Sequence, residues 1–184
     1  MNKVIITVLG KDRPGIISLI SNILYELDCN LENANQMILQ HQFAGFFIVD
    51  PPSNTDLENF SQTLQRKIKM SGLTVHVDTV KANTISKESI KGETFLITTI
   101  GPDQKGLVAR FSKIISQHNA NIENLKAVFK GGSDPTANIM SYQVFIAIDI
   151  DTGKLFDSLR QKAKELDLDI RIQHKNIFDA INKI

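Results

Sequence analysis

The sequence is poor in the residues that mark secreted, membrane and metal-binding proteins. Its 184 residues include no tryptophan, a single cysteine (Cys29) and four histidines. One cysteine cannot form an internal disulfide, and the histidines are scattered without the spacing of a zinc site. No apolar run reaches the roughly 18 residues of a membrane span, and the first run is too short for a signal-peptide core. We therefore expect a cytoplasmic protein without a metal site or a membrane segment.

An excess of charge of one sign is also missing. The chain has 21 lysines and arginines against 20 aspartates and glutamates, and the first 85 residues hold 7 basic and 8 acidic side chains. A protein that grips a phosphate backbone through counterion release needs a clear basic excess. The segment 42–47 holds three phenylalanines but lacks the basic residue and alternating aromatics of an RNA-binding strand. Direct nucleic-acid binding is not expected, and these rings are assigned to a core and an interface.

The sequence lacks catalytic motifs. The spacing of Gly10 and Gly15 imitates the start of a P-loop, but Ile16 and Ile17 stand where lysine and serine or threonine must reach the phosphates. No nucleophile, base and orienting acid can be assembled from residues shared by both halves of the chain. We expect a protein that is not an enzyme and carries no cofactor.

What the sequence does contain is an internal repeat. Residues 10–33 align without a gap on residues 101–124, so the chain holds two homologous units. The identical pairs gather in one turn and in one short polar motif: Gly10/Gly101, Asp12/Asp103, Gly15/Gly106, Asn30/Asn121, Glu32/Glu123 and Asn33/Asn124.

Each unit shows the pattern of a strand, a helix, two strands, a helix and a strand. Alternating or continuous apolar residues predict strands at 4–9, 30–40, 43–50 and 73–77, and at 94–100, 121–130, 140–150 and 168–172. Helical spacing marks residues 16–27 and 57–68, and 107–115 and 155–166, with Pro14 suited to a first helical turn. With right-handed crossovers this order predicts an α+β, ferredoxin-like fold (βαββαβ) in both units.

The domain boundaries follow from the polar segment between the units. We place the first domain at residues 1–80, a linker at 81–92 and the second domain at 93–175. Residues 176–184, with apolar side chains three and four apart, predict a short closing helix. The second unit also has a longer turn between its middle strands, at residues 131–135.

The repeated turn and the repeated asparagines are the main functional clue. Two glycines let the turn bend sharply, and the helix that follows offers N–H groups to a carboxylate or phosphate. Asn30 and Asn121, which start the next strand, could face the same turn with their amides. The structural alternative is that Asp12 and Asp103 only cap the helices and that the two asparagines only relieve a left-handed junction.

This pattern resembles a tandem ACT domain. The motif Gly-x-Asp-x-x-Gly, an apolar helix and then Asn-Leu/Ile-Glu-Asn occurs on both repeated units, over nearly the whole chain. By length and by the run Asp12-Arg13-Pro14-Gly15, the chain is similar to the family of glycine cleavage system transcriptional repressors, small cytoplasmic proteins made of two ACT domains. The resemblance implies a regulatory protein that binds an amino acid, with glycine or serine favoured, between domains. It also implies self-association and a regulatory protein as partner.

The resemblance assigns ligand binding to eleven positions of this chain: Asp12, Arg13, Gly15, Ile16, Asn30, Leu31, Asp103, Gly106, Leu107, Asn121 and Ile122. The second unit departs from the pattern because Gln104 and Lys105 replace Arg13 and Pro14, so its site is expected to bind differently or not at all. Two other functions stay open, a detached regulatory subunit of an amino-acid biosynthetic enzyme and an assembly module whose pocket is vestigial.

Overall fold

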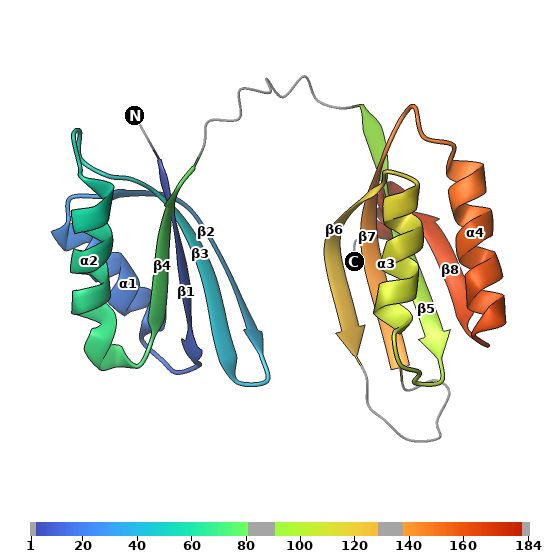
Figure 1. Ribbon diagram of the computed structural model, residues 1–184, viewed down its shortest axis with the longest axis horizontal. Helices are drawn as coiled ribbons and strands as arrows, with labels where there is room; N and C mark the ends of the chain where they lie inside the picture. The colour runs from blue at the N-terminus through green and yellow to red at the C-terminus, as the bar shows by residue number, and fades with distance from the viewer. Residues whose placement is uncertain (1–2, 81–90, 129–137, 182–184) are drawn as a thin grey trace. The chain divides into compact units, whose positions relative to one another are not determined.

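The computed structural model describes residues 3–80, 91–128 and 138–181 and divides the chain into two compact units (Figure 1). Unit 1 comprises Met1–Ile85 and unit 2 comprises Ser86–Ile184. Residues 81–90 of the expected linker lie outside the described residues, and Gly92 already belongs to a strand.

Both units contain the predicted order of elements. Unit 1 consists of β1 (Val4–Lys11), α1 (Ile16–Glu26), β2 (Asn30–Leu39), β3 (Gln42–Asp50), α2 (Leu57–Ile68), a 3-10 turn (Lys69–Ser71) and β4 (Thr74–Thr79). Unit 2 consists of β5 (Gly92–Gly101), α3 (Leu107–Gln117), β6 (Asn121–Val128), β7 (Asn138–Ala147), α4 (Thr152–Glu165), β8 (Asp169–His174) and α5 (Lys175–Ile181).

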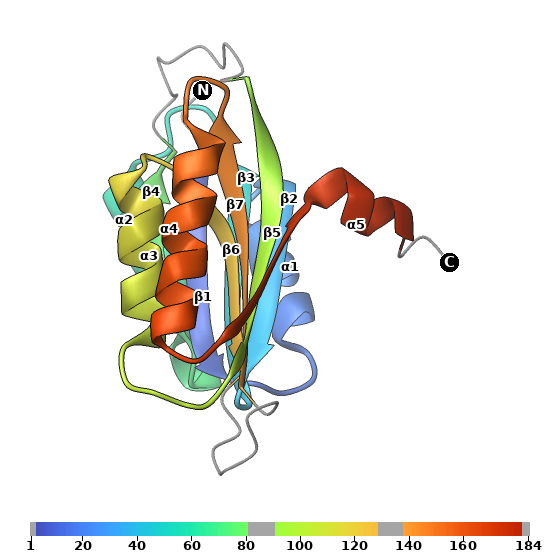
Figure 2. The same ribbon diagram turned by 90° about the vertical axis from the view of Figure 1, so that its right-hand side faces the viewer.

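The sheets confirm the ferredoxin-like fold. Their strand orders are β2-β3-β1-β4 and β6-β7-β5-β8, and all neighbouring strands are antiparallel. In unit 1 both helices cover the same face of the sheet (Figure 1). In unit 2, α5 follows β8 and turns away from α3 and α4 (Figure 2).

The core of each unit lies between the sheet and its helices. Alternate residues of β1 and β3 point at α1 and α2, which is why these strands carry apolar side chains at every second position. Removing each such side chain from water contributes roughly 1.5–3 kcal/mol. The residues of unit 1 that are at most 1% exposed are Ile6, Val8, Ile20, Leu24, Phe47, Val49, Leu64 and Ile68, and those of unit 2 include Ile97, Phe111, Ile115, Tyr142, Val144, Leu155 and Leu159.

The backbone repeats as closely as the sequence. Asp28 and Asn119 both adopt φ 55° just after the first helix of their unit. Gly72 (φ 72°) and Asp167 (φ 54°) both adopt a left-handed conformation just after the second helix. Such residues end helices and free the chain to turn into a strand.

Several sequence-based boundaries are wrong. Pro14 lies outside α1, because the helix starts at Ile16 with Gly15 as its N-cap. Strand β7 ends at Ala147, so residues 148–150 do not extend it. Residues 129–130 of the expected strand and the turn at 131–135 lie outside the described residues.

Candidate functional site

The repeated turn leaves the start of the following helix open. Gly15 (φ 91°) and Gly106 (φ 81°) are the N-cap residues of α1 and α3, and no side chain caps either helix. A Cβ placed on Gly15 would meet no heavy atom within 4 Å, so the turn is not packed shut. The first N–H groups of a helix have no partner inside it and lie at its positive end. The turn can therefore hold a carboxylate.

The capping alternative for Asp12 and Asp103 is wrong. Neither carboxylate accepts a hydrogen bond from its helix, whereas Asp56 and Asp151 do cap α2 and α4. The backbone N–H of Asp12 donates instead to the carbonyl of His41 at 2.8 Å, which fixes the turn against the loop between β2 and β3.

The first glycine of each turn has a packing role instead. A Cβ on Gly10 would lie 2.5 Å from Cδ2 of Leu73, and a Cβ on Gly101 would lie 2.6 Å from Cδ2 of Leu168. Carbon atoms in contact prefer about 3.5–4.0 Å. These two glycines therefore allow the end of the first strand to lie against the residue that precedes β4 or β8.

Both turns are tied to the end of the second helix by the same contact. Nη2 of Arg13 donates to the carbonyl of Ser71 at 3.2 Å, and Nε2 of Gln104 donates to the carbonyl of Leu166 at 2.7 Å. Ser71 and Leu166 each stand just before the left-handed residue of their unit. The change from arginine to glutamine thus keeps the tie and removes a positive charge.

The asparagines lie at the opposite end of the sheet from the turn of their own unit. Gly10 pairs with Phe43 at one end, whereas Asn30 pairs with Asp50 at the other, next to the pair Val4–Val49. At about 3.3 Å per residue, the six residues from Val4 to Gly10 separate the two ends by about 20 Å. The expectation that these amides face the same turn is therefore wrong.

Unit 2 has the same arrangement. Gly101 pairs with Asn138 beside the turn, and Asn121 pairs with Phe145 toward the far end of β7. The left-handed alternative for Asn30 and Asn121 is also wrong, because both lie in strands at ordinary negative φ.

The repeated Asn-Leu/Ile-Glu-Asn motif forms a β-bulge. The register skips Glu32 between Leu31 and Asn33, and it skips a residue at the equivalent place between Ile122 and Asn124. A bulge re-aims side chains at a sheet edge and often borders a binding site.

The bulge glutamates are anchored within their own sheets. Glu32 pairs with Nζ of Lys3 at 2.7 Å, and this partner raises the pKa of Lys3. Glu123 accepts a hydrogen bond from Nε2 of Gln143 at 2.9 Å. Beside this motif, burial raises the pKa of the Cys29 thiol, which disfavours the thiolate form that acts as a nucleophile.

The predicted residues differ in what they can offer to a ligand. Ile16 and Leu107 are each 2% exposed, so their side chains belong to the core and only their main-chain N–H groups face the turn. Asp12 and Ile122 are half-buried. The other predicted residues are exposed: Arg13, Gly15, Asn30, Leu31, Asp103, Gly106 and Asn121.

Two further features near the predicted residues escaped the sequence analysis. Nε of Arg110 lies 3.9 Å from the position of a Cβ on Gly106, which adds a cation beside the start of α3. Its position four residues after Gly106 in a helix is the signal that could have found it. Asn121 and Ile122 also line a groove of about 530 Å³. The other wall of this groove is formed by α3, with Ala109, Ser112 and Ser116 among its residues.

Neither a membrane helix nor a metal cluster occurs among residues 3–80, 91–128 and 138–181. None of their helices has the length and apolar character of a membrane span. No three histidine, cysteine, aspartate or glutamate side chains in these ranges come together to hold a metal ion.

Both units are thus ferredoxin-like domains in which the first helix begins, without a side-chain cap, after a left-handed glycine. The chain belongs to the ACT domain family, whose model matches residues 2–78 and 93–173. The predicted family resemblance is thereby confirmed.

The curated relatives have the length of one unit. The UPF0237 protein of Methanopyrus kandleri is 33% identical over 89 residues, which are 48% of this chain and 96% of the relative. The UPF0237 protein of Methanococcus maripaludis is 30% identical over 92 residues, which are 50% of this chain and 99% of the relative.

Two solved structures share the fold of nearly the whole chain. An unknown protein from Galdieria sulphuraria has a TM-score of 0.74 at 19% identity, covering 94% of this chain and 98% of the other. A protein provisionally designated a glycine cleavage system transcriptional repressor has a TM-score of 0.70 at 15% identity, covering 94% and 96%.

Proposed function

We propose that this protein binds a small amino acid, with glycine or serine favoured, and regulates a process by contacting another protein. The observation that carries the proposal is the open, uncapped start of α1 behind Gly15, which suits a ligand carboxylate. The designation of the solved neighbour supports glycine metabolism and control of transcription as the setting. Because we propose action through another protein, this control would be indirect.

The amino group of the ligand needs acceptors, and we assign these to the asparagines of a second ACT domain. Asn30 lies too far from the turn of its own unit, but antiparallel pairing of two such strands reverses the ends. In a fully overlapped pair of β2 strands, Asn30 of one strand stands opposite Leu39 of the other, at the end where the turn lies. A complete site then combines one turn with the asparagines of another domain.

The outer edge of β2 supports such pairing. β2 is an edge strand, and all ten of its residues are exposed. Four of them are large and apolar, at 41–64% exposure: Leu31, Met37, Ile38 and Leu39. An exposed edge of this kind is a template for pairing with another strand. Self-association of ACT domains would thus both cover the edge and complete the site.

Regulation then follows from binding linkage. A ligand that touches two domains shifts their packing only by as much as its affinity differs between the two arrangements. Such a shift can be passed to a partner protein without any chemical step.

Isothermal titration against the common amino acids tests the proposal. We expect heat with glycine or serine for the unaltered protein and about fivefold or more weaker binding for Gly15→Val, because valine at φ 91° strains the turn by about 1–3 kcal/mol. Gly72→Val is the matched control, since Gly72 is also left-handed, at φ 72°, with no atom within 4 Å of a Cβ. Gly106→Val reports on the second unit in the same way.

Absence of heat with every amino acid, in protein shown to be folded by circular dichroism, would refute the sensing role. Recovery of a metabolic enzyme in place of a transcription regulator in a pull-down would assign the chain to the detached regulatory subunits.

A further inference from the structure

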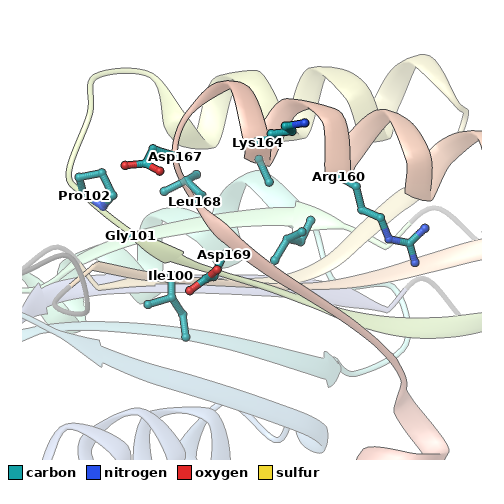
Figure 3. A pocket seen from close by; sticks show the side chains of 10 residues that line it. Ile100, Gly101, Pro102, Arg160, Lys164, Asp167, Leu168 and Asp169 are labelled. Atoms are coloured by element: carbon teal, nitrogen blue, oxygen red, sulfur yellow. The ribbon is translucent and has the colours of Figure 1, made fainter.

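A groove occurs at the same place in both units, between the second helix and the last strand of the sheet. In unit 1 it measures about 530 Å³ and lies between α2 and β4. In unit 2 it measures about 750 Å³ and lies between α4 and β8, as Figure 3 shows from close by. The floors are apolar at equivalent positions, with Ile68, Leu73 and Val75 in unit 1 and Ala163, Leu168 and Ile170 in unit 2.

The unit 1 groove borders unpaired backbone. β4 is an edge strand that pairs only with β1. The N–H of Val80 donates to the carbonyl of Lys3 at 2.8 Å, so the main-chain groups of Val80 point toward β1. Because antiparallel strands alternate bonded and non-bonded residues, the N–H and C=O groups of Val75, Val77 and Thr79 point outward. A further strand could bind to these groups.

The positive charge of the unit 1 groove favours an acidic segment as the added strand. Its lining includes Arg66 and Lys69 and no acidic side chain, and neither cation makes an ion pair with any of the described residues. The polar remainder of the lining is neutral, with two glutamines and a threonine. Alternate residues of a strand face opposite sides of the sheet. A segment therefore fits this groove when the side chains on its helix side include an apolar residue for the floor and, two residues away, a carboxylate for Arg66 or Lys69.

The unit 2 groove occupies the equivalent place but is larger and has a balanced charge. Arg160 and Lys164 line it together with Asp167 and Asp169, and Arg160 also pairs with Asp157 at 3.2 Å. Figure 3 shows the acidic side chains near the start of β8 and the basic ones on α4. The chain therefore contains its own control for the effect of charge.

We propose that the groove of unit 1 binds an extended, acidic segment of a partner protein as a fifth strand beside β4. Main-chain bonds to Val75, Val77 and Thr79 hold the segment, and its apolar side chains enter the floor over Leu73. Its carboxylates face Arg66 and Lys69. This surface is separate from the amino-acid site and stands if that site fails.

The test is fluorescence anisotropy with a labelled peptide of the pattern Glu-Thr-Val-Thr-Glu-Thr-Val, which places glutamate and valine on the same face of a strand. The comparison peptide carries lysine in place of each glutamate. We expect the acidic peptide to bind and the basic one not to bind. The double variant Arg66→Glu/Lys69→Glu should weaken the acidic peptide about tenfold or more, since two exposed charge pairs are lost and replaced by repulsion. The matched variant Arg160→Glu/Lys164→Glu should leave its affinity unchanged.

A second variant separates the strand from the charge. Val77→Pro removes an outward N–H while leaving both cations in place, and an edge strand tolerates proline at such a position. It should abolish peptide binding even at low salt. If it unfolds unit 1, the charge variants decide alone.

Three results would overturn the proposal. The first is no binding of the acidic peptide to the unaltered protein. The second is equal loss from the unit 1 and unit 2 charge variants. The third is a dimer of the chain, broken by Val77→Pro, that excludes the peptide, because β4 then pairs with a second copy. Amino-acid titration of the charge variants keeps this test apart from the proposed function, since it should be unaffected.

Discussion

The packing role of Gly10 can be tested by combining Gly10→Ala with Leu73→Ala, which removes the Cδ2 atom that the added Cβ would contact. The Cβ of Gly10→Ala would lie 2.5 Å from Cδ2 of Leu73 and 3.3 Å from the carbonyl oxygen of Gly72. Overpacking of this kind costs about 1–3 kcal/mol of unfolding free energy. Leu73 is 9% exposed, and Leu73→Ala alone should cost about 2 kcal/mol, the low end for a leucine at the rim of a core.

The double variant Gly10→Ala/Leu73→Ala should be more stable than the sum of the single effects. Truncating Leu73 removes Cδ2, so the alanine Cβ fills part of the space, and we expect a coupling of about 1–2 kcal/mol. The equivalent pair Gly101 and Leu168 should show less rescue, because a Cβ on Gly101 also lies 3.0 Å from the main-chain oxygen of Asp167.

Hydrogen exchange read by mass spectrometry measures this coupling unit by unit. Peptides from β1 and β3 report the opening free energy of unit 1, and peptides from β5 and β7 serve as an internal reference. Additive effects within about 0.5 kcal/mol would show that Leu73 does not explain Gly10. Weakened amino-acid binding in the double variant, despite restored stability, would then point to direct ligand contact at Gly10.

Two further predictions concern single side chains. Burial raises the pKa of Tyr142 to about 12, against an ordinary value of about 10, so the folded chain keeps a proton that the unfolded chain releases. Stability should therefore fall between about pH 10 and pH 12 by up to ~1.4 kcal/mol per pH unit, and Tyr142→Phe should remove that slope in urea titrations. Arg13→Ala should cost unit 1 about 0.5–1.5 kcal/mol through the lost bond to Ser71, measured by the same exchange experiment. Arg13→Gln should cost little, because Gln104 makes the equivalent bond to Leu166; equal losses in the two variants would contradict this reasoning.

The fold was accessible from the sequence because burial in a two-layer unit has a simple period. The residues of β1 that alternate inward, Val4, Ile6 and Val8, are all at most 2% exposed. The strand order followed from the element order and the right-handed crossover rule. Because the sequence repeats, the pattern of each helix and strand occurs twice, and each unit supports the prediction made for the other.

The composition of the site was less accessible, because sequence neighbours are not neighbours in the sheet. Asn30 starts the strand that follows α1, yet the 11 residues of that helix return the chain by about 16 Å along the sheet. This length of helix places the asparagines at the far end of the sheet from the turn. Contacts such as Arg13 to Ser71 join residues 58 positions apart, and no local pattern announces them.

The repeated turn of unit 1 contributes to both proposed surfaces, the amino-acid site and the α2–β4 groove. Gly15 is the N-cap residue at the open start of α1. Gly10 packs on Leu73, which lies in the floor of the α2–β4 groove. Arg13 ties the same turn to the last residues before β4. A displacement of the turn must therefore change either the packing on Leu73 or the bond to Ser71. Because interior packing has few alternative arrangements, we expect an amino acid that favours one turn position to change the groove as well. The free energy available for that change is limited to the difference in ligand affinity between the two positions.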